Sequence, residues 1–133
     1  MSKENPRVAS IATENFAALL GVELVSHQAD RVVVRMPYKP ALGVGRVHGG
    51  AISALVDIAA TAAFWSRDDL HPDSRGATVG FTINYLRLAI GESLTASAEV
   101  RRRGGTLCTG DVSVTNEHDD EIAVARVTYK LSR

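Results

Sequence analysis

The sequence contains little of what several classes of protein require. It has one cysteine, Cys108, which excludes an internal disulfide and a cysteine-based metal site. Its 15 basic and 15 acidic side chains give a formal net charge of zero, which argues against a partner that is nucleic acid or a membrane surface, because such binders carry excess Lys and Arg. The first ten residues are polar, so no secretory signal is predicted and we expect a cytoplasmic protein.

The chain does contain a nearly charge-free run at residues 51–65, AISALVDIAATAAFW, in which Asp57 is the only ionisable side chain. In a helix built from this run, apolar residues fall on every side, a pattern typical of a helix buried all round. Its length of about 15 residues is too short to cross a bilayer. Because an unpaired buried charge is costly, we expect Asp57 to have a partner elsewhere or a chemical role.

The remaining pattern predicts an α+β fold in a single domain of residues 1–133. A short helix is expected over residues 10–20, closed by Gly21, and the long helix over residues 49–66. Strands are predicted at 22–28, 31–36, 77–88, 93–103, 106–115 and 122–131. Because the long helix is apolar, we expect an antiparallel sheet to curl around it.

One ridge of the long helix differs from the rest. Positions 49, 53, 57 and 61 hold Gly, Ser, Asp and Thr, and residues four apart lie on one side of a helix. Such a ridge either packs closely against another backbone or lines a cavity. Gly49 and Gly50 leave backbone N–H groups uncovered at the positive end of the helix dipole, which can stabilise a carbonyl oxygen that gains negative charge. The same pair would also permit a tight turn into the helix.

The spacing between Gly49 and Asp57 carries a further consequence. Eight residues of helix span about 12 Å, whereas one reacting carbonyl needs both groups within roughly 3–4 Å. Two copies of the helix running antiparallel across a two-fold axis bring Gly49 of one copy opposite Asp57 of the other. Such a dimer would have two equivalent sites.

The segment VHGGAISALVDIAATAAF resembles the signature of hotdog-fold acyl-CoA thioesterases, in the PaaI-like branch of the phenylacetate pathway. In that branch HGG precedes an aspartate by the spacing between His48 and Asp57. The resemblance continues in TVGFTINYLRLAIGESLTASAEVRRRGGTL and EIAVARVTYKL and covers residues 10–131. It implies a hotdog fold, in which a curved antiparallel sheet wraps a long central helix, and pairing into a homodimer or homotetramer.

The resemblance also implies the roles of individual residues. Gly49, with Gly50 beside it, would supply the oxyanion-hole N–H. Asp57 of the partner subunit would act as nucleophile or general base, and Thr78 would help to position the attacking water. The implied substrate is an acyl-coenzyme A, with no metal and no redox cofactor.

Five further residues bear on the predicted site. His48 could act as a base, or it could hold the loop before the helix by hydrogen bonds. Six residues before His48 the family commonly carries an asparagine that contacts the reacting group; this chain has Leu42, so that polar contact is expected to be missing. Arg87, Arg102 and Arg103 could bind the phosphates of coenzyme A, or they could simply be solvated at a strand end.

Hydrolysis of an acyl-CoA thioester is therefore the function that the sequence favours. One alternative is a hotdog hydratase or dehydratase, which uses a histidine and a carboxylate on separate segments and fits the close spacing of His48 and Asp57 poorly. Another is a non-catalytic acyl-CoA binding protein, which the presence of Leu42 makes conceivable.

Overall fold

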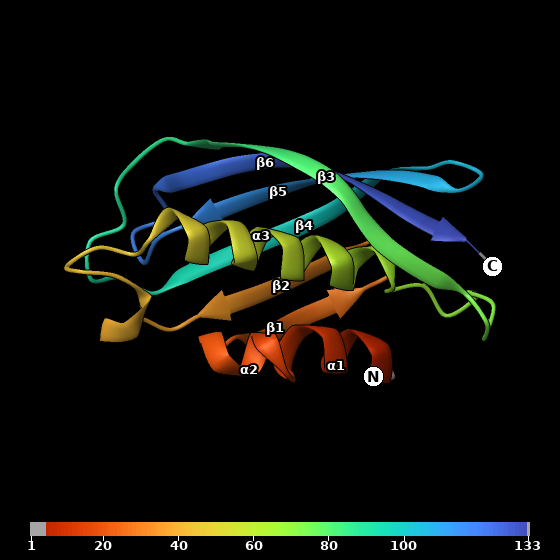
Figure 1. The fold of residues 1–133 in the computed structure, drawn as a ribbon, viewed down its shortest axis with the longest axis horizontal. Helices are drawn as coiled ribbons and strands as arrows, with labels where there is room; N and C mark the ends of the chain where they lie inside the picture. Colours follow the sequence, from red (N-terminus) through yellow and green to blue (C-terminus); the bar gives the residue numbers. More distant parts are fainter. Residues whose placement is uncertain (1–4, 133) are drawn as a thin grey trace.

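A six-stranded antiparallel sheet curls around one long helix in the computed structural model, which describes residues 5–132 (Figure 1). The elements are α1 Pro6–Thr13, α2 Phe16–Leu20, β1 Glu23–Gln28, β2 Arg31–Met36, a 3₁₀ turn at Pro40–Leu42, α3 Gly49–Phe64, β3 Arg75–Tyr85, β4 Leu94–Arg103, β5 Leu107–Thr115 and β6 Glu121–Ser132. The strand order is β1-β2-β4-β5-β6-β3, so β1 and β3 are the edges. The α+β architecture predicted from the sequence is confirmed.

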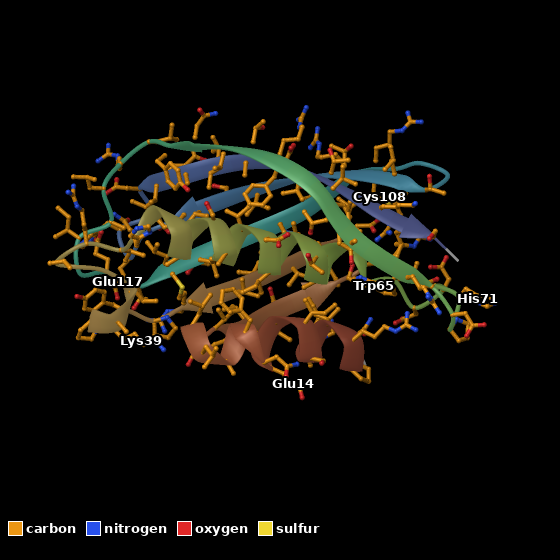
Figure 2. The ribbon with its side chains drawn as sticks, in the orientation of Figure 1. Glu14, Lys39, Trp65, His71, Cys108 and Glu117 are labelled. Carbon is orange, nitrogen blue, oxygen red and sulfur yellow. The ribbon has the colours of Figure 1, made fainter. Side chains whose placement is uncertain are left out.

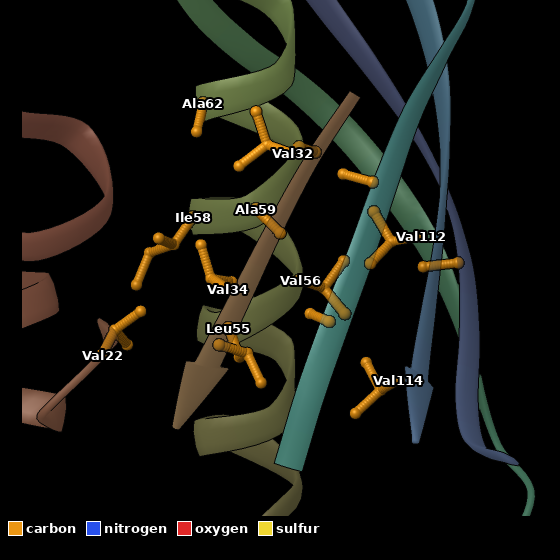
Figure 3. Packing of buried hydrophobic residues seen from close by; sticks show 14 of the residues in the cluster. Val22, Val32, Val34, Leu55, Val56, Ile58, Ala59, Ala62, Val112 and Val114 are labelled. Carbon is orange, nitrogen blue, oxygen red and sulfur yellow. The ribbon is translucent and has the colours of Figure 1, made fainter. Parts of the chain in front are cut away.

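The hydrophobic core lies between α3 and the inner face of the sheet (Figure 3). Successive residues of a strand point to opposite faces, so Val32 and Val34 of β2, and Val112 and Val114 of β5, all point towards the helix. Burial of each such side chain contributes roughly 1.5–3 kcal/mol. The buried side of α3 consists of Ile52, Leu55, Val56, Ile58, Ala59, Ala60, Ala62, Ala63 and Phe64.

The N-terminal helix differs from the prediction, because it starts earlier and consists of two pieces. Asn5 caps α1 by accepting hydrogen bonds from the N–H groups of Arg7 and Val8, and Pro6 occupies the first helical position. Both are recognised start signals. The break between α1 and α2 lies at Asn15, whose φ of 54° is left-handed. Gly21 closes α2 in the left-handed conformation, as predicted.

The six strands lie close to their predicted positions. The largest difference is at β3, which ends at Tyr85 rather than at residue 88, three residues earlier (88 − 85 = 3). It ends there because the N–H groups of Leu86 and Arg87 both donate to the carbonyl of Ile122, which takes the chain out of the regular ladder. The first hairpin turns at Asp30, which adopts a φ of 68°.

The expectation that α3 is buried all round is wrong on one side. Gly49, Ser53, Asp57 and Thr61 are only half-buried, as are Ala51 and Ala54 beside them, whereas the large apolar side chains of the helix are covered. The ridge lies beside β3, the edge strand, and no further strand continues the sheet beyond it within residues 5–132. This chain alone therefore leaves its one small and polar ridge open. Across the same residues, no helix has the length and apolarity needed to span a bilayer.

Candidate active site

The start of α3 is held in place by a tight loop. His48 N–H donates to the carbonyl of Leu42 at 2.7 Å, and Val47 N–H donates to that of Ala89 at 2.8 Å. Gly43 makes this loop possible, because a Cβ at that position would overlap the carbonyl of Arg46. The loop thus delivers His48 to the helix start in one orientation.

His48 caps α3, and this separates the roles of the two glycines. Its Nδ1 accepts the N–H of Gly50 at 2.8 Å, so the proton of the neutral imidazole lies on Nε2. The N–H groups of Ala51 and Ile52 donate to the His48 carbonyl. Within residues 5–132 the Gly49 N–H has no acceptor. Gly49 is therefore the open donor at the positive end of the helix, and the Gly50 N–H is not available for an oxyanion.

Asp57 and Thr78 form a pair on the open side of the helix. Thr78 Oγ1 donates to Asp57 Oδ1 at 2.7 Å, and no ion pair with Asp57 is present among the described residues. The threonine comes from the inner face of β3, next to the irregularity in register between Thr78 and Gly80. A bond to one carboxylate oxygen fixes the orientation of the group and leaves Oδ2 for chemistry. Thr78 was expected to help to position the attacking water; in this structure its hydroxyl holds the carboxylate of Asp57.

Tyr85 is a site residue that the sequence analysis missed. Its hydroxyl donates to the Gly49 carbonyl at 2.9 Å and lies 2.6 Å from Ser53 Oγ. Because the single hydroxyl proton goes to Gly49, Ser53 is the donor in the shorter bond. A Cβ on Gly49 would lie 3.4 Å from the Tyr85 ring, so the tyrosine packs directly over the helix start. The sequence offered one indication of this role: in its predicted strand, Tyr85 shares with Phe81 and Ile83 the face expected to point towards the helix.

A pocket of about 510 Å³ adjoins the helix start. Gly49, Tyr85 and His48 line one side of it, and Arg46 and Arg87 supply two guanidinium groups. Arg87 also approaches Asp120, at 4.0 Å. An apolar pocket with cationic side chains beside an open N–H can hold a thioester together with a phosphorylated group.

Arg103, expected as a possible ligand of the coenzyme A phosphates, does not line this pocket within one protomer. It forms an ion pair with Asp30 at 2.8 Å and donates to the carbonyls of Phe64 at 3.1 Å and Ala63 at 3.4 Å. It thus satisfies carbonyls that every helix leaves free at its C-terminus. The exposed Arg102 directly precedes it, and the 16 residues of α3 place this end of the helix about 24 Å from Gly49 of the same protomer.

Leu42 is also placed differently from the expectation. Its side chain is 5% exposed and packs in the hydrophobic core, and it does not line the pocket beside Gly49. Within one protomer, Leu42 therefore belongs to the hydrophobic core and does not lie at the site where the family's asparagine would contact the reacting group.

Replacing Leu42 by Asn is accordingly expected to lower the free energy of unfolding by about 2–4 kcal/mol, because it buries an amide and removes apolar contacts. Chemical denaturation of the purified variant measures this loss. Leu42→Met, which conserves volume and apolarity, is the control and is expected to cost less than about 1.5 kcal/mol. Wild-type stability of Leu42→Asn would show that the side chain lies in a polar setting.

The described residues contain no group of three or more His, Cys, Asp and Glu side chains placed to hold a metal ion. The groups that the site presents are the Gly49 N–H, the Asp57–Thr78 pair and the surrounding hydroxyls. A backbone donor and an oriented carboxylate can together support acyl transfer.

Comparison with known proteins adds to this geometry. The family model "Thioesterase superfamily" matches residues 44–123, which include Gly49, Asp57 and Thr78. The medium/long-chain acyl-CoA thioesterase YigI of Escherichia coli is 29% identical over 132 residues, covering 87% of this chain and 84% of that protein. A thioesterase family protein from Silicibacter pomeroyi has a TM-score of 0.83 at 30% identity and covers 92% of each chain. The E. coli PaaI protein from the phenylacetic acid degradation operon has a TM-score of 0.80 at 26% identity, covering 91% of this chain and 86% of that one.

Proposed function

Since the chain belongs to the thioesterase superfamily and is a thioester hydrolase with the hotdog fold, we propose that it hydrolyses acyl-coenzyme A at a site shared by two protomers. Gly49 of one protomer and Asp57 of its partner act on one thioester. The observation that carries the proposal is that both groups lie open on a single ridge, about 12 Å apart along the helix. Neither protomer alone brings them to one carbon atom.

The open ridge and the β3 edge together form the proposed pairing surface. An edge strand presents unpaired N–H and C=O groups that pair readily with another strand, and β3 is 11 residues long. Val79, at the irregularity of β3, is 62% exposed. A second β3 running antiparallel continues the sheet and places the two α3 ridges face to face. The result is a homodimer with two equivalent sites, which can pair again as a homotetramer.

In the proposed reaction, the Gly49 N–H donates to the thioester carbonyl oxygen and stabilises the negative charge that develops on it. Asp57 Oδ2 either takes a proton from a water that attacks the carbonyl carbon, or attacks the carbon itself to give an anhydride that water then hydrolyses. Either route breaks the carbon–sulfur bond and releases coenzyme A and the free acid. Thr78 keeps Oδ1 occupied, so Oδ2 is presented in one orientation.

Arg46 and Arg87 are the proposed contacts for the coenzyme A phosphates, because both line the pocket beside Gly49 and guanidinium groups bind phosphate through paired hydrogen bonds. The similarity to YigI, a medium/long-chain acyl-CoA thioesterase, supports this substrate class. The hydratase alternative is disfavoured, because His48 Nδ1 is occupied by the Gly50 N–H and cannot accept a proton without losing the cap.

The proposal is tested by following thiol release from short, long and aromatic acyl-CoAs while the oligomeric state is measured by sedimentation. We expect hydrolysis of at least one class and a dimer or tetramer throughout the active concentration range. Active monomers would contradict the shared site. Absence of thiol release from every acyl-CoA would contradict the substrate class.

A further inference from the structure

A second pocket of about 510 Å³ lies at the other end of α3 and has no role in the reaction as proposed. It opens between α1, the end of α3 and the start of β3. The residues that matter here are Arg7, Ser10, Thr61, Trp65, Gly76 and Tyr129. Figure 2 labels Trp65 at the end of α3, close to β3 and to α1.

This pocket adjoins the Asp57–Thr78 pair. Thr61 lies one helical turn beyond Asp57 on the same ridge, which is about 6 Å along the axis. Gly76 lies two residues before Thr78 on the same inner face of β3, again about 6–7 Å away. A Cβ on Gly76 would overlap the ring of Tyr129. The pocket therefore begins one helical turn from Asp57 on α3 and two residues from Thr78 on β3.

The floor of the pocket carries an unused hydrogen-bond donor. Tyr129 is 3% exposed, and its hydroxyl oxygen accepts the indole N–H of Trp65 at 2.7 Å. The hydroxyl proton has no acceptor in the part of the chain that the structure describes. Burial raises the pKa of the Tyr129 hydroxyl, so the group keeps this proton at neutral pH. A buried donor without an acceptor is costly, and a ligand oxygen would satisfy it.

The wall of the pocket carries a cation. The Arg7 guanidinium carbon lies over the Trp65 ring, 4.9 Å from its centroid, and the group donates one hydrogen bond, at 3.2 Å, to the carbonyl of Pro72. Across residues 5–132, no carboxylate forms an ion pair with it. A half-buried guanidinium with spare donors, positioned over an aromatic ring, can receive a carboxylate. The hydroxyls of Ser10 and Thr61 increase the polarity of the same space.

From these contacts, and resting on the proposed function, we infer that this pocket binds the far end of the acyl group and selects acyl-CoAs whose acyl chain ends in a carboxylate. The far carboxylate accepts hydrogen bonds from Arg7 and Tyr129, while the chain lies along Thr61 and the Trp65 ring. The pocket begins at Thr61, about 6 Å beyond Asp57 along the helix, and ends at Trp65, about 12 Å beyond it. Extended dicarboxylic acyl groups of roughly six to eight carbons place the far carboxylate between these two limits.

The test compares matched pairs of substrates by thiol release: adipyl-CoA against hexanoyl-CoA, and suberyl-CoA against octanoyl-CoA. We expect kcat/KM to be at least about tenfold higher for one dicarboxylic substrate than for its uncharged partner, as a charge-assisted hydrogen bond provides. Arg7→Met is expected to reduce that ratio to about one, Arg7→Lys to reduce it partly, and Tyr129→Phe to lower it several-fold. Arg35→Met, which removes an exposed guanidinium on β2, is the matched control and should keep the wild-type ratio.

A second measurement separates recognition from a structural effect. Free adipate is expected to inhibit hexanoyl-CoA hydrolysis competitively in the wild type and more weakly in Arg7→Met, with melting temperatures recorded for each variant. Asp57-dependent hydrolysis of hexanoyl-CoA without any preference for adipyl-CoA or suberyl-CoA would overturn this inference and leave the proposed function standing. Loss of activity on every acyl-CoA would instead overturn both.

Discussion

Asp57→Asn is expected to lower kcat for thioester hydrolysis by about 10²- to 10⁴-fold, the contribution typical of a general base. The amide has the same shape, and its oxygen can still accept the hydrogen bond from Thr78 Oγ1. It cannot take a proton from water, and it is a far weaker nucleophile. Thiol release from the best acyl-CoA under saturating conditions measures the loss.

The matched control is Asp119→Asn, in the turn between β5 and β6. Asp119 is exposed and has a φ of 63°, a conformation that Asn tolerates, so wild-type activity is expected. Melting curves of both variants check that the fold is kept. If Asp57→Asn retains more than about a tenth of wild-type kcat, the carboxylate is not the reacting group.

The second large effect is a gain of activity on mixing two inactive variants. Asp57→Asn lacks the carboxylate, and Gly49→Pro lacks the open N–H. Proline fits at this position, because the first helical residue needs no hydrogen-bonded N–H and His48, which precedes it, is already extended with φ −61° and ψ 138°. Each variant alone has two defective sites in every dimer.

In a mixed dimer one site receives both defects and the other receives neither. Random exchange of subunits makes about half of the dimers mixed, so activity is expected to return to about a quarter of the wild-type value. Gly49→Ala, which keeps the N–H, is the control and should remain active alone. Failure of any rescue, with mixed dimers verified by mass spectrometry, would show that Gly49 and Asp57 do not share a site across protomers.

The parts of the fold that follow from local pattern were predictable. The run of residues 51–65 indicated the central helix because it is apolar on nearly every side and too short to span a bilayer, so it has to be buried in the core. The glycine and turn signals separated the strands. The break at Asn15 was not predicted, since a left-handed asparagine leaves no clear mark in an otherwise helical stretch. The start of α1, by contrast, carries a recognisable signal in the sequence, the capping Asn5 followed by Pro6.

The site was predictable to the extent that it depends on spacing along one helix. Gly49 and Asp57 were found from their positions on the ridge. The roles of Arg103, Tyr85 and Tyr129 were not, because each depends on a partner far along the chain: Arg103 on Phe64, Tyr85 on Gly49 and Tyr129 on Trp65. Sequence alone shows the type of side chain and the face of the strand or helix on which it lies, but not which distant atom it contacts.

The contacts of Arg103 with Asp30 and with the last carbonyls of α3 limit how far the helix can shift along its own axis. Such a shift would affect catalysis in the proposed dimer. In the proposed dimer the two helices point in opposite directions, so a slide of each along its own axis changes the registration of Gly49 against Asp57 by twice that slide. A misplacement of 1 Å at a reacting centre can lower the rate by about 10²-fold. In the proposed dimer, a shift of only about 0.5 Å in each helix would produce that misplacement. Arg103 fixes the end of α3 through Asp30 and the last carbonyls of the helix, and His48 fixes its start. Together these contacts keep Gly49 and Asp57 aligned in both proposed sites.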